Sequence, residues 1–142
     1  MEQRDYILRE IEKIGVMLKY LLGKMIPVKA VKEKDDVSEE INNELFENLG
    51  YNISSLLKIS KNEFNEIFKY NKGFNLENIE LLAELLYKIS QKKPDNSKKI
   101  LQKSFELYEF VNEAGKTFSF EREKQIDKIK NELQLYINNP DE

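Results

Sequence analysis

The amino-acid sequence predicts an all-α fold of about six to seven helices, arranged as an antiparallel helical bundle or a short stack of helix hairpins. Apolar residues recur at spacings of three and four along most of the 142 residues, which is the period of a helix that buries one face. Alternation with a period of two is short everywhere, and no Asn-Gly or Asp-Gly pair is present to close a β-hairpin. The composition agrees, because 40% hydrophobic and 35% charged residues are typical of helices with a solvated outer face.

The first helix is predicted from Gln3 to Leu22, or as far as Met25, within an N-terminal amphipathic segment of residues 1–26. One apolar seam runs along it with a 4-3-4-3-4 spacing, formed by Ile7, Ile11, Ile14, Leu18, Leu21 and Met25. Further apolar residues flank the seam, so this face is too wide for one neighbouring helix and needs a groove between two helices or a partner. Gly15 in the middle of the helix costs about 1 kcal/mol relative to alanine. It is either tolerated or marks the close approach of another segment.

A charged, aperiodic segment follows the first helix. Pro27 ends the helix, because proline lacks an amide donor and disfavours helix at the residue before it. Residues 27–36 are therefore predicted to form a mobile linker. A helix tethered in this way can fold back onto its own chain or reach a second chain.

Residues 37–137 are predicted to form a helical core with repeat-like hairpins, followed by a frayed tail at 138–142. Its helices are expected over residues 37–49, 52–58, 60–71, 75–90, 97–115 and 119–137. Phe46 is assigned to the apolar face of the first of these.

Polar residues at the predicted helix starts have the chemistry of caps. Ser60 and Glu63 have the spacing of a capping box. Asn75, Ser97 and Ser119 are each expected to cap the helix that follows, because their side chains can accept from free backbone amides.

Two groups of aromatic residues are assigned to packing. The first has too few interleaved basic residues for a base-stacking platform, and consists of Phe64, Phe68, Tyr70 and Phe74. The second flanks the last cap and is expected to pack against the preceding hairpin, and consists of Phe118 and Phe120.

The run from Leu82 to Glu123 resembles degenerate tetratricopeptide-like helix pairs. Ala83 stands where a small residue lets paired helices approach one another. The small–aromatic–small rhythm of a second repeat helix is matched by Ser104, Tyr108 and Val111. The resemblance implies a hairpin stack that binds other proteins.

The whole chain also resembles uncharacterised bacterial families of small all-helical proteins. The opening DYILREIEKI (residues 5–14), the pair Leu21 and Leu22, and the closing KTFSFEREKQIDKI (residues 116–129) carry this resemblance. It implies no activity.

The residue types present argue against an enzyme. The chain contains no histidine and no cysteine, which removes the commonest general base, metal ligand and nucleophile pairs. Carboxylates alone could act, and two trios share a helical face: Glu77, Glu80 and Glu84, and Glu106, Glu109 and Glu113. We interpret them as solvated surface, and predict no catalytic residue, no cofactor and no metal site.

The leading hypothesis is a non-enzymatic protein–protein interaction module or small scaffold, which binds a protein partner or a second copy of itself through the seam. The alternative is attachment to a membrane surface through the basic side of the first helix, at Arg9, Lys13, Lys19 and Lys24. A carboxylate-only enzyme is the third. A net charge of −3 disfavours nucleic acid as a partner. The N-terminus does not resemble a signal peptide, so the cytoplasm is expected.

Overall fold

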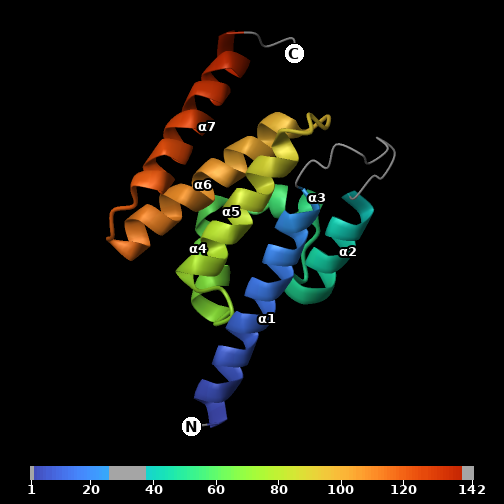
Figure 1. Ribbon diagram of the computed structural model, residues 1–142, viewed down its shortest axis with the longest axis vertical. Helices are drawn as coiled ribbons and strands as arrows, with labels where there is room; N and C mark the ends of the chain where they lie inside the picture. Colours follow the sequence, from blue (N-terminus) through green and yellow to red (C-terminus); the bar gives the residue numbers. More distant parts are fainter. Residues whose placement is uncertain (1, 26–37, 139–142) are drawn as a thin grey trace. The chain divides into compact units, whose positions relative to one another are not determined.

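A computed structural model describes residues 2–25 and 38–138, so the predicted linker 27–36 and residues 139–142 of the predicted tail lie outside the described residues. The described residues form seven α-helices and no strand, which confirms the all-α prediction (Figure 1). The helices are α1 (Glu2–Lys24), α2 (Ser38–Leu49), α3 (Ile53–Leu57), α4 (Lys61–Tyr70), α5 (Leu76–Ser90), α6 (Ser97–Gly115) and α7 (Phe120–Asn138).

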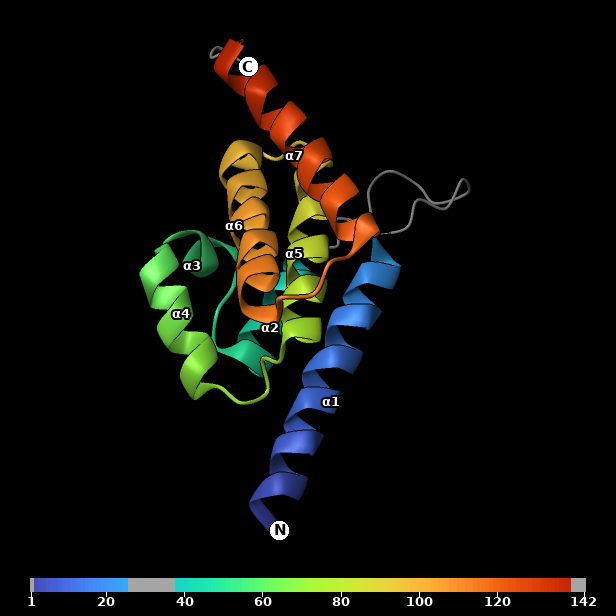
Figure 2. The ribbon, with the colours of Figure 1, turned by 90° about the vertical axis from the view of Figure 1, so that its left-hand side faces the viewer.

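The chain divides into two compact units, Met1–Asn78 and Ile79–Glu142, which we call unit 1 and unit 2. The division falls inside α5. In unit 1, α1 lies beside α2 and runs antiparallel to it (Figures 1 and 2). The Tyr20 hydroxyl of α1 donates to Glu40 Oε1 of α2 at 2.7 Å.

The buried side chains of unit 1 follow the predicted helical stripes. The second half of α1 and one face of α2 contribute Ile14, Leu18, Leu21, Ile41 and Leu45. Three of the four aromatics assigned to the core are also buried, and their rings form a chain: Phe64 stacks on Phe68 with centroids 5.3 Å apart, and Phe68 meets Phe74 edge-on at 5.2 Å.

Two aromatic predictions in unit 1 are wrong. Phe46 and Tyr70 are exposed. Phe46 follows Leu45 directly, so the helical rotation of about 100° per residue turns it away from the face that Ile41 and Leu45 bury. Tyr70 is the last residue of α4, two positions beyond the buried Phe68.

The helix boundaries of unit 1 confirm the predicted caps. Ser60 and Glu63 form the capping box, with the Glu63 amide donating to Ser60 Oγ at 3.2 Å and the Ser60 amide to Glu63 Oε1 at 3.3 Å. Asn75 Oδ1 accepts from the Asn78 amide at 2.9 Å at the start of α5. Gly50 ends α2 with φ = 82°, a left-handed conformation that favours glycine.

Unit 2 contains most of α5, together with α6 and α7. The α6 and α7 helices form an antiparallel hairpin, and the C-terminal turns of α7 extend past α6 (Figures 1 and 2). Ser104 Oγ donates to the Ala83 carbonyl at 2.7 Å, and neither residue is accessible to solvent. These are the two small residues of the predicted hairpin, and they let α5 and α6 approach closely.

Two of the predicted packing or capping roles in unit 2 are wrong and one is confirmed. Ser119 caps α7 by accepting from the Arg122 amide at 3.2 Å. Ser97 does not cap α6, because it is already the first helical residue, and its hydroxyl instead bonds to the Tyr136 hydroxyl at 2.8 Å. Phe118 and Phe120 are exposed rather than packed, since they lie on either side of the cap at the turn between the helices.

Candidate functional site

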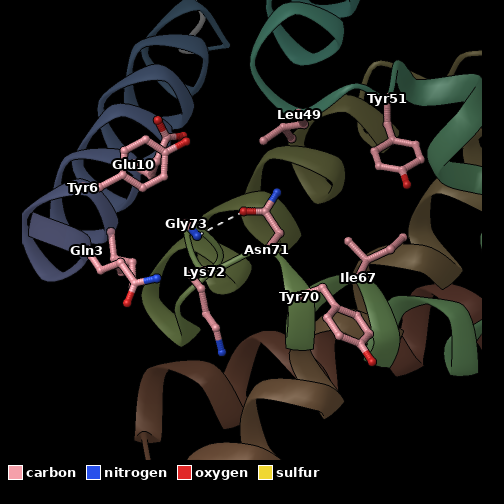
Figure 3. A pocket seen from close by; sticks show the side chains of 11 residues that line it. Gln3, Tyr6, Glu10, Leu49, Tyr51, Ile67, Tyr70, Asn71, Lys72 and Gly73 are labelled. Atoms are coloured by element: carbon pink, nitrogen blue, oxygen red, sulfur yellow. Dashed lines mark hydrogen bonds between the residues drawn. The ribbon is translucent and has the colours of Figure 1, made fainter.

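A groove of about 780 Å³ in unit 1 is lined by residues of α1, the α2–α3 connection and the end of α4 (Figure 3). We call it the tyrosine groove, after Tyr6, Tyr51 and Tyr70, which line it together with aliphatic and polar side chains. Its volume is within the range of about 300 to 1,000 Å³ typical of binding clefts. The α1 wall consists of residues spaced i, i+3, i+4 and i+7, which places them on one helical face: Gln3, Tyr6, Ile7 and Glu10.

The turn after α4 forms the base of the groove. The Asn71 amide donates to the Ile67 carbonyl at 2.8 Å, and Asn71 Oδ1 accepts from the Gly73 amide at 3.0 Å, which is the dashed bond in Figure 3. A Cβ atom at Gly73 would lie 2.6 Å from Ile14 Cδ1 and 3.4 Å from Glu10 Cβ. A larger residue at position 73 would therefore require the Ile14 side chain to shift, so glycine favours the close passage of α1 beside the turn.

Asn78 joins α1 to that turn. It is 3% exposed, and its Nδ2 donates to the Ile11 carbonyl at 2.9 Å and to the Gly73 carbonyl at 2.8 Å. A Cβ atom at Gly15 would lie 3.0 Å from Asn78 Oδ1. Of the two interpretations of Gly15, the structure supports the close approach of another segment. The bonds of Asn78 hold the α1 wall of the groove in place.

The surface of the groove is aromatic and aliphatic, with polar groups at its edges. Tyr6 is 61% and Tyr70 is 73% exposed. Such large exposed aromatics, beside the half-buried Ile7 and Ile67, offer contact area with little loss of side-chain entropy on binding. Glu10 and Lys72 supply one charge of each sign to the lining.

The structure separates the six residues of the predicted seam into two sets. Ile14, Leu18, Leu21 and Met25 are buried within the chain. Ile7 and Ile11 are half-buried, and only Ile7 lines the tyrosine groove. The seam is thus not one continuous free surface in the folded chain, and its accessible part lies at the N-terminal end of α1.

A second polar cluster surrounds Arg122 in unit 2. This arginine is 6% exposed, and its guanidinium donates to Glu80 Oε1 at 3.0 Å, to Asn112 Oδ1 at 2.5 Å and to the Thr117 carbonyl at 2.7 Å. Asn112 Nδ2 in turn donates to Glu123 Oε1 at 2.9 Å. Each of the three guanidinium nitrogens donates to a protein acceptor, so the cluster fastens α5, α6 and α7 together and leaves Arg122 engaged.

The two carboxylate trios lie outside the tyrosine groove. In the described part of the chain, none of their six residues lines that groove or either of two further hollows. Glu80 pairs with Arg122 at 3.0 Å and Glu106 with Lys103 at 3.0 Å. Within residues 2–25 and 38–138, no group of three or more carboxylates is placed to hold a metal ion.

Tyr108 has the most perturbed titration in unit 2. Burial, together with the nearby carboxylates of Glu84 and Glu80, raises the pKa of its hydroxyl above the ordinary value. All three effects disfavour the phenolate, so Tyr108 stays neutral at physiological pH. Its environment is that of a core residue.

Sequence reasoning did not identify Tyr6, Tyr51 and Tyr70 as a group, because they belong to three separate elements. The spacing of Gln3, Tyr6, Ile7 and Glu10 was the available signal, since it predicts a shared face beside the seam. The long-range bonds of Asn78 and Arg122 had no signal, because Ile11 lies 67 positions from Asn78 and Glu80 lies 42 positions from Arg122. Comparison with known protein families, curated proteins and solved structures finds no match for this chain.

Proposed function

We propose that this chain is a non-enzymatic protein-binding module whose contact surface is the tyrosine groove. The partner is an amphipathic segment of another protein that inserts apolar side chains between Tyr6, Tyr51 and Tyr70. The observation that carries the proposal is the largely exposed pair Tyr6 and Tyr70, with Tyr6 on the α1 wall that Asn78 holds in place. Exposed apolar surface of this kind, with a polar rim, is typical of protein interaction sites.

The chemistry of the groove favours binding over catalysis. Glu10 is the only carboxylate among its lining residues and Lys72 the only cation. Aromatic and aliphatic side chains, in contrast, are the groups that supply most of the energy at protein interfaces.

Membrane attachment through α1 is less well supported by the geometry. A helix that lies in a membrane surface inserts its apolar face. In this chain Leu18 and Leu21, at the centre of that face, are fully covered by protein. In addition, none of the helices in the described part of the chain combines the length and apolarity that a membrane span requires.

Site-specific photo-crosslinking tests the proposal. A photoreactive benzoylphenylalanine is placed at Tyr70 in the groove or, as a matched control, at Phe118, an exposed aromatic in unit 2. Crosslinking in host cells should yield a product at position 70 that is absent at position 118. Adding Ile7→Glu should remove that product, while circular dichroism and the urea midpoint show that the variant is folded.

The crosslinked segment then supplies the decisive measurement. A peptide of that segment should bind the purified chain, and replacing its apolar residues by serine should weaken binding at least tenfold. Identical products at positions 70 and 118, or peptide binding that Ile7→Glu leaves unchanged, would show that the groove is not the contact surface. Flotation with anionic vesicles provides the membrane comparison, in which the proposal expects the chain to remain unbound.

A further inference from the structure

A second groove of about 680 Å³ lies between α1 and α2 in unit 1, and it shares no lining residue with the tyrosine groove. Its apolar part is formed by α1, where Val16 is 62% and Tyr20 is 49% exposed, with Met17 buried beneath them. The Tyr20 hydroxyl is fixed by its 2.7 Å bond to Glu40 on α2. The ring therefore stays on the surface of the groove.

The two sides of this groove carry opposite charge. The α1 side contributes Arg9 and Lys13 together with Glu12, and the α2 side contributes Glu44 and Asn48. The α2 helix is acidic throughout, because SEEINNELFENL holds four glutamates and no basic residue.

The charges on the two sides of the groove do not pair with one another in the described chain, and Arg9 Nε donates instead to the Asp5 carbonyl at 3.5 Å. Among residues 2–25 and 38–138, no ion pair within 4.0 Å involves Arg9, Lys13, Glu44 or Glu47. The closest polar contact of the Glu44 carboxylate is a 3.4 Å bond from Asn48 Nδ2. Facing charges that stay apart within one chain are free to pair with the opposite charges of another molecule.

We propose that a second copy of this chain occupies the α1–α2 groove, so that the protein forms a two-fold symmetric dimer. A symmetric interface must be complementary to itself, with residue i meeting residue j and j meeting i. Because α1 and α2 are antiparallel neighbours (Figure 1), a two-fold axis that runs along the groove places α1 of each copy opposite α2 of the other. Lys13 of each copy then faces the acidic α2 of the other copy. The two α1 and two α2 helices together form a four-helix bundle.

The same arrangement covers the exposed apolar residues. Val16 and Tyr20 project from α1 between the two charged sides, and their symmetry-related copies approach them across the axis. The alternative two-fold axis, perpendicular to the helices, would set α1 against α1 and α2 against α2. It would bring the glutamates of the two α2 helices together, and the resulting repulsion excludes it.

Charge reversal in mixed dimers tests this interface. Sedimentation velocity of the full chain across the micromolar range should show a monomer–dimer equilibrium that weakens with added salt. Lys13→Glu and Glu44→Lys should each raise the dimer dissociation constant about tenfold or more, because each change acts twice in a symmetric dimer. An equimolar mixture of the two variants should restore association, since each variant then meets its opposite charge.

Controls separate this result from misfolding and from the function proposed above. Phe46→Ala removes an exposed aromatic that does not line the groove, and should leave the dissociation constant unchanged. A wild-type chain that stays monomeric at high micromolar concentration would overturn the proposal. Single variants without effect, or a mixture that fails to restore association, would do the same. Crosslinking at Tyr70 is independent of each of these outcomes.

Discussion

Replacing each of two glycines of α1 by alanine is expected to change the stability of the protein in opposite directions. Gly15 and Gly23 both lie within the helix, so replacing either by alanine removes a propensity penalty of up to about 1 kcal/mol. Among the described residues, no atom outside the adjacent backbone of α1 lies within 4 Å of a Cβ built at Gly23, whereas at Gly15 the new Cβ would be 3.0 Å from Asn78 Oδ1. Gly23→Ala is therefore expected to stabilise the protein by about 0.5 to 1 kcal/mol.

The Gly15→Ala substitution is expected to destabilise the protein. To relieve the contact, Asn78 must move by a few tenths of an ångström, but both hydrogens of its amide group are bonded, to Ile11 and Gly73. Overpacking of this kind costs about 1 to 3 kcal/mol, and each weakened hydrogen bond about 1 kcal/mol. After subtraction of the propensity gain, the free energy of unfolding should fall by about 1 kcal/mol, so that the two variants differ by about 2 kcal/mol.

Urea unfolding followed by far-UV circular dichroism measures this difference. The urea concentration at the midpoint should rise for Gly23→Ala and fall for Gly15→Ala, while the slope of the unfolding free energy against urea concentration stays unchanged. Adding Asn78→Ala to Gly15→Ala provides the internal control, because in that background the alanine at position 15 should become stabilising. A Gly15→Ala variant as stable as Gly23→Ala would refute the argument that Asn78 limits the space beside α1.

Three further predictions concern unit 2. Arg122→Met should lower the free energy of unfolding, measured with urea, by about 2 to 3 kcal/mol, because it leaves Glu80 and two further acceptors without their donor. Adding Glu80→Met should recover part of that loss. Tyr108→Phe should leave stability at pH 7 nearly unchanged. Above about pH 10 the wild-type protein loses stability, because the tyrosine ionises in the unfolded state while its raised pKa keeps the hydroxyl neutral in the folded state, and the variant should lose less. Ser104→Leu should lower the melting temperature, since it inserts a larger side chain against the Ala83 carbonyl at a cost of about 2 kcal/mol or more.

Matched exposed positions test whether these effects are specific. Lys130→Ala on α7 should change the free energy of unfolding by less than about 0.5 kcal/mol, and an equal effect of Arg122→Met would contradict the role of the buried cluster. A Tyr108→Phe variant whose stability falls above about pH 10 as steeply as that of the wild type would contradict the assigned environment of Tyr108. Ser104→Ala should cost about 1 kcal/mol from the lost hydrogen bond. A melting temperature for Ser104→Leu above that of Ser104→Ala would show that the two helices are not closely packed there.

The helices could be predicted well because caps and helical periodicity depend only on residues a few positions apart in the sequence. The capping box of Ser60 and Glu63 is complete within four residues, and the spacing of Ile14, Leu18 and Leu21 depends only on the helical period. Ser97 was misassigned because several polar residues precede α6, and any of them could be its cap.

The candidate site could not be predicted in the same way. Tyr6, Tyr51 and Tyr70 meet only because three separate elements fold together, and each of them alone resembles an ordinary surface or core tyrosine. The seam illustrates the reverse case. Its pattern showed correctly that one face of α1 is apolar, but the pattern was the same for Ile7 and Leu18, one accessible and one buried.

The bond from Asn78 to Ile11 also has a consequence for the time course of folding. Its two residues are 67 positions apart, whereas Arg122 binds Asn112 and Thr117 within ten residues. At about 5 to 20 residues per second, a ribosome needs roughly 3 to 13 seconds between adding Ile11 and adding Asn78. For most of that interval α1 is complete in sequence, but the residue that bonds to its Ile11 carbonyl has not yet been added. The helix that is synthesised first is therefore not secured by Asn78 until the sequence of unit 1 is complete.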